Sequence, residues 1–388
     1  MPNGFISDFY KNTEIISPDD SYHYFFAYYD MRATASHSGN KHLCHRVSFM
    51  DRLPSEDDVC EIGYLENKKF YPIDTTTAWN FQQGAMLEYH PIIPDTVIYN
   101  VCEEGAFRTV IHNYVSGEKK YADRATACHS NDGRYGLAVN FGRIFDFRPG
   151  YGYAGFIDYG KDICAPKDDG VFLTDLISGT SELLVSYEAM QEAAGFGKDD
   201  KILVNHITFN RDSDRYVMLV RNFPKPGGWW STSMVIGDLS GNIRTVLPNT
   251  YVSHYHWRDG RRIVAHCTYD GVTSMFEIDV DSCAATNFYL PYFEEKGNPD
   301  IHCNYSPDLS YIIGDGYPHG DYRSLLAYSI KTGKSVKLFS AYGPDPDIID
   351  IRCDLHARFV YDGRAISYDT VHNGKRQIAL VPTDPLNF

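Results

Sequence analysis

Four histidines recur in this sequence at nearly constant spacing and in the same local pattern. His206, His254, His302 and His356 lie 48, 48 and 54 residues apart. Each is followed three positions later by an aromatic residue, and two or three positions after that by an aspartate. Four neutral imidazoles that meet at one point would suit a divalent metal such as Zn²⁺ or Mn²⁺. The alternative is that each histidine is a hydrogen-bonded residue at the start of a strand, with the same structural role in every repeat.

The same repeat predicts the elements that position these histidines. A period of this length is typical of β-propeller blades. The Asp-Gly or Pro-Asp pairs indicate hairpin turns, and the apolar run behind each turn indicates the next strand. We expect seven turns, near residues 39, 94, 132, 212, 259, 308 and 362. Because repeated positions recur around the axis of a propeller, the four side chains should point toward one central region.

The expected fold is therefore all-β, a seven-bladed β-propeller that spans residues 1–388 as a single domain. A strand within the aromatic-rich residues 1–30 is expected to close the ring by pairing with the last blade. We find neither a linker nor a composition change that would indicate a second domain. A helix-like stretch at residues 188–194 is expected on the rim.

Composition and charge restrict the possible partners. The net charge of −15 argues against nucleic acid, although a local basic pocket would still accept an anionic sugar. No run of 18 apolar residues is present, so no membrane span is expected. Nine cysteines without a CxxC pair favour free thiols. The first residues do not resemble a signal peptide, which predicts a cytoplasmic protein; a periplasmic or secreted protein that has lost its leader is the alternative.

A polar stretch precedes the second expected strand of the second blade. Asn80, Gln82 and Gln83 lie in an otherwise apolar and aromatic segment. Buried amides need hydrogen-bond partners, so these either lock a loop or face a ligand, and we favour the ligand. His90 follows, and His112 lies on a neighbouring strand. Neighbouring strands of one blade would bring the two imidazoles together as an acid/base pair, whereas each alone would more often be a structural residue.

The repeat is interrupted after the third expected turn. The turns near residues 132 and 212 are 80 residues apart, and the extra chain is rich in glycine, proline and aromatics. Long excursions of this kind are usually functional. Arg143 and Arg148 would bind an anion, and Tyr151 and Tyr153 would act as acid/base or stacking groups. The alternative is an Ω-loop packed on its own aromatic side chains.

A second aromatic loop is a candidate for sugar binding. Residues 223–230 combine prolines and glycines with Trp229 and Trp230. Exposed tryptophan rings can hold the apolar faces of sugars. The high aromatic content of the chain, 14%, fits a carbohydrate-facing surface, but it also fits the composition of many short strands.

Two runs and the histidine pattern together resemble a known group of proteins. The run at 79–84, Trp-Asn-Phe-Gln-Gln-Gly, and the run at 140–153 resemble propeller-type polysaccharide lyases. The resemblance is closest to the seven-bladed ulvan lyases and more distant to the oligogalacturonate lyases. In the ulvan lyases two histidines, a tyrosine and an arginine act together on the uronate. By position, these would be His90, His112 and either Tyr151 or Tyr153.

The arginine departs from the pattern of the family. It should follow shortly after the tyrosine, but that interval contains Lys161 and Lys167, and no arginine before Arg211. Either a lysine substitutes, or Arg143 or Arg148 serves instead, or this chain has lost the activity.

The oligogalacturonate lyases imply a role for the repeated histidines. In that family they hold a divalent metal, which points to His254 and His356, with His302 and His206 as further members. One group of the wider family carries a structural zinc, so the resemblance leaves open whether a metal would be catalytic or structural.

The resemblance implies a lyase that cleaves a uronate-containing poly- or oligosaccharide by β-elimination. That reaction needs the carboxylate neutralised, a base for the C5 proton and an acid for the leaving oxygen. Two alternatives remain from the sequence. One is a glycoside hydrolase on the same scaffold, because a fold does not fix a chemistry. The other is a propeller that binds glycans without turnover.

Overall fold

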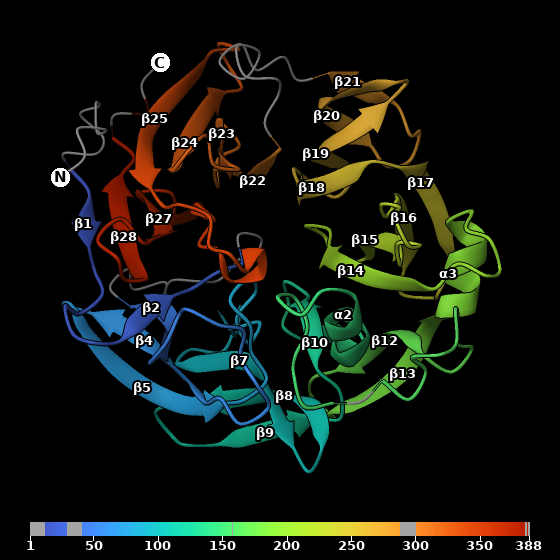
Figure 1. Cartoon of the computed structure of the whole chain (residues 1–388), viewed down its shortest axis with the longest axis horizontal. Helices are drawn as coiled ribbons and strands as arrows, with labels where there is room; N and C mark the ends of the chain where they lie inside the picture. The colour runs from blue at the N-terminus through green and yellow to red at the C-terminus, as the bar shows by residue number, and fades with distance from the viewer. Residues whose placement is uncertain (1–11, 29–40, 157, 288–299, 385, 387–388) are drawn as a thin grey trace.

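Seven four-stranded antiparallel sheets surround a central axis (Figure 1). This computed structural model describes residues 12–28, 41–156, 158–287, 300–384 and 386. The prediction of an all-β, seven-bladed propeller is confirmed.

The first four sheets follow one another along the chain. The first contains β2 (His23–Phe25), β3 (His42–Val47), β4 (Cys60–Glu66) and β5 (Lys69–Thr76). The second contains β6 (Glu88–Tyr89), β7 (Thr96–Glu103), β8 (Ala106–Asn113) and β9 (Lys119–Ala122). The third contains β10 (Thr126–His129), β11 (Tyr135–Ala138), β12 (Gly170–Asp175) and β13 (Thr180–Ser186). The fourth contains β14 (Ile202–Phe209), β15 (Arg215–Asn222), β16 (Thr232–Asp238) and β17 (Ile243–Thr250).

The last three sheets complete the ring. The fifth contains β18 (Val252–Trp257), β19 (Arg262–Tyr269), β20 (Val272–Asp279) and β21 (Ala285–Asn287). The sixth contains β22 (Ile301–Tyr305), β23 (Tyr311–Gly316), β24 (Tyr322–Ser329) and β25 (Ser335–Tyr342). The seventh combines β26 (Arg358–Val360), β27 (Ala365–Thr370) and β28 (Gln377–Pro382) with β1 (Glu14–Ile15) from the other end of the chain.

The pairing of β1 with β28 joins the first and last parts of the ring. Glu14 lies opposite Leu380, and the Ile16 amide donates to the Ile378 carbonyl at 3.0 Å. Figure 1 shows β1 beside β28 at the edge of the ring. The aromatic segment that follows β1 continues into β2, the innermost strand of the first sheet.

Burial explains why the inner strands read as apolar runs. Every residue of β14 and of β22 is buried, because neighbouring sheets cover both faces of an inner strand. The outer strands β5 and β13 instead mix exposed and half-buried positions. Six of the expected turns connect the first and second strands of their sheets, and the turn expected near residue 39 lies outside the described residues.

Among the described residues, two short helices lie on the ring. The helix α2 (Phe141–Phe147) belongs to the long excursion between β11 and β12, and the Asn140 side chain caps its first turn. The helix α3 (Tyr187–Ala193) lies on the outer rim, where a helix was predicted (Figure 1). A single 3₁₀ turn, η1 (Ile349–Ile351), precedes the last inner strand. No helix of the described residues is long and apolar enough to cross a membrane, and all nine cysteines are free thiols.

Candidate functional site

The four repeated histidines lie in one row around the axis. Neighbouring ring centroids are 6.2 Å apart for His206 and His254, 4.3 Å for His254 and His302, and 4.4 Å for His302 and His356. The first three lie on the inner strands β14, β18 and β22, and His356 lies just before β26. All four side chains are buried. The repeat in the sequence therefore becomes a cluster in space.

Three residues at one end of this row form a set of possible metal ligands. One ligand atom each from His302, Asp354 and His356 lies within 4.8 Å of the others. Two imidazole nitrogens and a carboxylate oxygen are a donor set that suits Zn²⁺ or Mn²⁺. His206 and His254 continue the row beyond this set, so only two of the four histidines predicted as ligands belong to it.

A buried aspartate in the sixth sheet holds these ligands in position. The Asp315 carboxylate accepts hydrogen bonds from the Leu355 amide at 2.8 Å and the Ala357 amide at 3.4 Å. It also bonds the His302 Nδ1 at 3.3 Å. Between the two amides, His356 adopts a φ of +42°, which residues other than glycine rarely adopt. Asp315 therefore fixes both the strained turn and the ring of His302, as the outer partners of metal ligands do.

The carboxylates of Asp315 and Asp354 make the electrostatic potential at His302 negative. Burial opposes protonation of His302, but Asp315 and Asp354 outweigh burial and raise its pKa to about 9. Asp354, although buried, is kept ionised by Arg352 and His302, which hold its pKa well below the usual range. A divalent cation would balance the same charge that the proton on His302 balances, so the residues fit a bound metal.

A second aspartate orients His254. Asp300 bonds the Nδ1 of His254 at 2.8 Å and accepts from the Tyr251 hydroxyl at 3.0 Å. Burial lowers the pKa of His254, even though Asp300 favours its charged form. A neutral His254 that donates from Nδ1 keeps its lone pair on Nε2.

Tyr151 lies beside this row, between two arginines. The Arg352 Nη2 donates to the Tyr151 hydroxyl at 3.0 Å, and the Arg148 guanidinium lies 4.5 Å from the centre of its ring. Burial opposes ionisation of the phenol, but the charges of Arg352 and Arg148 outweigh it and lower the pKa of Tyr151. Arg148 is in turn held by Asp350 at 2.8 Å.

Two further side chains complete the surroundings. Arg221 on β15 is buried, donates to the Val252 carbonyl at 3.3 Å, and lies close enough to Tyr151 for the two charges to affect each other. Tyr28 contacts the other end of the histidine row, where its hydroxyl lies 2.8 Å from the His206 Nδ1.

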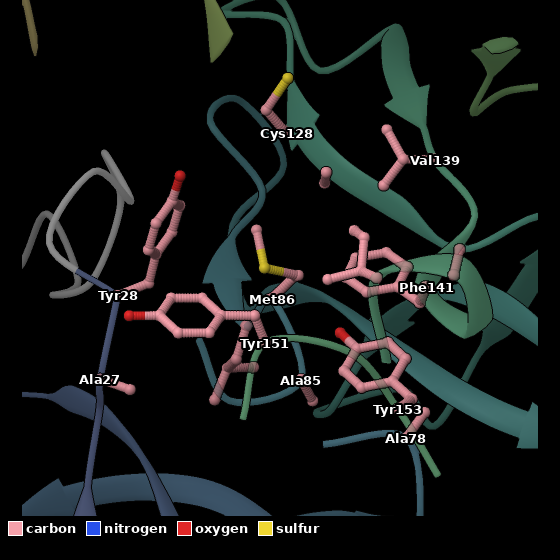
Figure 2. Packing of buried hydrophobic residues seen from close by; sticks show 14 of the residues in the cluster. Ala27, Tyr28, Ala78, Ala85, Met86, Cys128, Val139, Phe141, Tyr151 and Tyr153 are labelled. Carbon is pink, nitrogen blue, oxygen red and sulfur yellow. The ribbon is translucent and has the colours of Figure 1, made fainter. Parts of the chain in front are cut away.

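Tyr153 and Arg143 have structural roles, which corrects their predicted catalytic roles. Tyr153 stacks on Phe141 with ring centroids 4.2 Å apart, and its hydroxyl accepts from Asn100 at 3.0 Å. Figure 2 shows it beside Phe141, whereas the hydroxyl of Tyr151 points toward the side where Tyr28 lies. Arg143 is fully buried and binds Asp158 at 3.2 Å and four backbone carbonyls. It therefore ties the excursion to the ring.

His90 and His112 do not form the predicted pair. The His90 amide bonds Thr96, whereas His112 lies opposite Val97, one position along β7. Successive side chains of a strand point to opposite faces of the sheet, so this offset separates the two imidazoles. The His90 Nδ1 accepts from the Ile92 and Ile93 amides, and His112 contacts Tyr99 and Asp74.

Asn80 and Gln82 hold neighbouring loops in place, which is the alternative to the predicted ligand-binding role, and that role of Gln83 stays a prediction. Asn80 accepts from the Gln82 and Gln83 amides and donates to the Gly152 carbonyl at 3.1 Å. Gln82 donates to the carbonyls of Asp350 and Arg352 at 3.0 and 2.9 Å. Gln83 is also buried. These contacts hold the segments that carry Tyr151 and Arg352. The amides therefore stabilise the candidate site indirectly, through the backbone of those segments.

The predicted aromatic loop has one exposed and one packed tryptophan. Trp229 is 72% exposed and stacks on Trp230 with centroids 4.2 Å apart. Trp230 in turn contacts Phe147 at the end of α2, next to Arg148. The loop therefore adjoins the segment that carries the site, and binding of a sugar ring there remains a prediction.

Several members of the site were missed from the sequence. Arg352 comes from 201 residues beyond Tyr151, so it could not be found by searching just after the tyrosine. Asp315 had a visible signal, because it is a carboxylate within an apolar strand. Asp300, Asp354 and Arg221 were not singled out, although Asp354 lies two residues before a repeated histidine.

No protein-family model matches this chain, and no curated protein matches it in sequence. Among solved structures, an oligogalacturonate lyase in complex with manganese is similar with a TM-score of 0.68 and 14% identity, over 95% of this chain and 92% of its own. An oligogalacturonate lyase from Vibrio parahaemolyticus has a TM-score of 0.64 and 12% identity, over 97% and 98% of the two chains.

Propellers with other activities are also similar. The tricorn protease has a TM-score of 0.51 and 12% identity, over 98% of this chain but 34% of its own. At such identities the likeness shows the fold alone. The resemblance to oligogalacturonate lyases is thus supported at the level of the fold, and the closer resemblance to ulvan lyases remains a prediction.

The role of Asp315 can be tested by an isosteric change. Asp315→Asn replaces one acceptor oxygen by an amide that cannot accept from the Leu355 or Ala357 amide. Leaving a buried N–H unsatisfied costs about 1–3 kcal/mol, so the free energy of unfolding should fall by that amount in denaturant titrations. Asp281→Asn on the rim is the control. An unchanged unfolding midpoint for Asp315→Asn would contradict the assigned anchoring role.

Proposed function

We propose that this protein is a lyase that cleaves a uronate-containing oligo- or polysaccharide by β-elimination at Tyr151. The observation that carries the proposal is a buried tyrosine with a lowered pKa, held between two arginines beside a ligand set for a divalent cation. The likeness to oligogalacturonate lyases in fold supports it.

The arginines supply the first requirement of the reaction. A uronate C5 proton becomes acidic only when the adjacent carboxylate is neutralised. Arg148, Arg352 and Arg221 lie around Tyr151 and are the groups that would bind that carboxylate. Because Asp350 and Asp354 already hold two of them in place, little reorganisation is needed when the substrate binds.

Tyr151 supplies the second requirement. As a phenolate it takes the C5 proton, the electron pair of that bond forms the C4–C5 double bond, and the C4–O4 bond breaks. In a uronate whose C5 proton and O4 lie on the same face of the ring, such as glucuronate, the proton on Tyr151 can then pass to the O4 leaving oxygen, which restores the phenolate, so that one residue serves as base and acid. In galacturonate the two lie on opposite faces, so Tyr151 would serve as the base and a separate donor on the other face would protonate O4.

His302, Asp354 and His356 would hold a divalent metal, for which the manganese complex of a similar lyase is a precedent. Such an ion would act as a Lewis acid toward the substrate carboxylate. Manganese or zinc remains open from the donor set.

The electrostatics favour elimination over hydrolysis. A glycoside hydrolase needs one carboxylic acid with a raised pKa beside a carboxylate. Near the axis, Asp300 and Asp354 have pKa values held well below the usual range by His254 and Arg352, respectively, despite burial. Both stay ionised and cannot act as the acid. Burial raises the pKa of Asp369, but its oxygens are bound by Arg358 and by the Phe26 and Ala27 amides. A glycan-binding protein without activity would not need a tyrosine with a lowered pKa.

Removal of the Tyr151 hydroxyl tests the proposed base. Wild-type protein incubated with polygalacturonate, ulvan and related glycans should form an unsaturated product that absorbs in the ultraviolet. Tyr151→Phe should lower kcat by about 10²–10⁴-fold, the usual contribution of acid/base catalysis. Tyr153→Phe, which removes a buried hydroxyl away from the site, is the matched control. Absence of product across the whole panel for the wild-type protein would reject the lyase.

The pH dependence of the rate tests the part played by Arg148. The base must be ionised, so activity is present above the pKa of Tyr151 and is lost as the pH falls through it. Arg148→Gln removes one of the charges that lower this pKa. The acidic limb of the pH–rate profile should therefore move to higher pH, and kcat at neutral pH should fall several-fold. Arg215→Gln on the rim should leave the profile in place, and an unmoved limb for Arg148→Gln would argue against a phenolate base.

Metal binding can be tested separately from activity. Elemental analysis of purified protein, after equilibration with Mn²⁺ or Zn²⁺ and desalting, should find about one ion per chain. His302→Ala and His356→Ala should each weaken binding by more than about 100-fold, since changing even an outer partner of a ligand costs 10–100-fold. His90→Ala should bind like the wild type. Equal metal content in all four proteins would remove the assigned ligand set.

A further inference from the structure

A cavity of about 250 Å³ lies between the segment before the last inner strand and the turn that joins β27 to β28. Its lining includes Met50, Tyr342, Arg352, Val371 and Arg376. The walls are mostly apolar, with two guanidinium groups among them. The only acid among the lining residues, Asp345, is already bound to Arg323.

Arg376 differs from the other buried arginines of this region. Arg323, Arg352 and Arg358 each pair with an aspartate. Arg376 is 2% exposed, yet within the part of the chain that the structure describes it forms no ion pair. A buried charge without a counterion is costly.

The hydrogen bonds of Arg376 leave it incompletely satisfied. Its Nη2 donates to the carbonyls of Ile351 and Arg352, and its guanidinium packs on the Phe81 ring at 4.4 Å. Its Nε has no hydrogen-bond partner among the described residues. Burial, with a smaller contribution from the positive charge of Arg323, lowers the pKa of Arg376, although Asp369 and Asp354 at longer range favour its charged form. An anion in the cavity would supply the missing counterion.

The cavity adjoins the proposed reaction centre through a shared residue. Arg352 lines the cavity and also donates to the Tyr151 hydroxyl at 3.0 Å. A ligand in the cavity therefore lies about one arginine side chain away from Tyr151. Because one side chain borders both places, the sugar unit next to the one at Tyr151 is the part of the substrate nearest to the cavity.

We propose that this cavity binds the carboxylate of a second uronate, next to the one cleaved at Tyr151, with Arg376 as its counterion. The proposal rests on the proposed function, because it places the neighbouring unit of the same substrate. Met50, Tyr342 and Val371 would pack against the faces of that sugar. The site would thus require an acidic unit at two consecutive positions and disfavour chains in which acidic and neutral sugars alternate.

Binding without turnover tests this subsite. Calorimetric titration of Tyr151→Phe with trigalacturonide gives the reference Kd. Adding Arg376→Gln, or filling the cavity with Val371→Trp, should each raise Kd about tenfold or more, because a charge-assisted contact is lost. Val115→Trp, equally bulky but in an exposed turn, should leave Kd unchanged. A carboxyl-reduced trisaccharide should bind weakly and alike to all variants.

The two proposals fail in different ways. If wild-type protein forms unsaturated product while both cavity substitutions leave Kd for trigalacturonide unchanged, the second subsite is wrong and the lyase stands. If the cavity substitutions weaken binding but no glycan is cleaved, the subsite stands and the lyase is wrong. Val371→Trp keeps Arg376 and its two backbone contacts, so a folding defect in Arg376→Gln would not leave the inference without a test.

Discussion

The carboxylate of Asp315 is the contact on which the candidate site depends. It is fully buried in the sixth sheet, and it accepts from the backbone on both sides of His356 while bonding the ring of His302. One side chain therefore joins the sixth inner strand to the start of the seventh. The acceptor for the flanking amides stabilises the left-handed backbone of His356, together with the bond from Arg358 to the His356 carbonyl. Without it, the two imidazoles would have no fixed separation.

Charge pairing organises the rest of the centre. The chain carries a net charge of −15, yet three guanidinium groups surround one phenol at the axis. Arg148 and Arg352 are each held by an aspartate, which fixes the direction of the group and lets it act on Tyr151 at the same time. Preorganised charge of this kind acts without reorganisation when a substrate binds. The negative net charge therefore does not conflict with an anionic ligand, because the electrostatic potential at Tyr151 depends mainly on the charged groups next to it.

The sequence predicted the features that recur along the chain, and it missed the contacts that occur only once. The fold and the meeting of the four histidines followed from a fixed period, because a period in sequence becomes a rotation about the axis. The excursion was found as an interruption of that period. Its two tyrosines could not be ranked, because only packing distinguishes Tyr151 from Tyr153. Likewise, no spacing in the sequence could connect Arg352 with Tyr151, since they lie 201 residues apart and meet only in the folded ring.

Two wrong predictions have the same physical origin. His90 and His112 were expected to meet on neighbouring strands, but β7 separates β6 from β8 in the sheet, and a shift of one residue in register places the two imidazoles on opposite faces. Asn80 and Gln82 were expected to face a ligand because buried amides need partners. Their partners are backbone carbonyls of the segments that hold Tyr151 and Arg352. In both cases the residue types correctly indicated that these positions matter to the structure, but they could not show where each side chain points.

The row of four imidazoles lies on the later sheets of the ring only. This uneven distribution of side chains, and not the fold, is the basis for a functional proposal. The later sheets contribute the row of four imidazoles, whereas the buried cluster of the first sheets includes Ala27, Met86 and Cys128 (Figure 2). Ala27 and Met86, like His356, have positive φ values, so the backbone is strained on both sides of the ring. The propeller of the tricorn protease shares the frame, so the proposed uronate substrate rests on the half-ring of imidazoles and its arginines rather than on the fold.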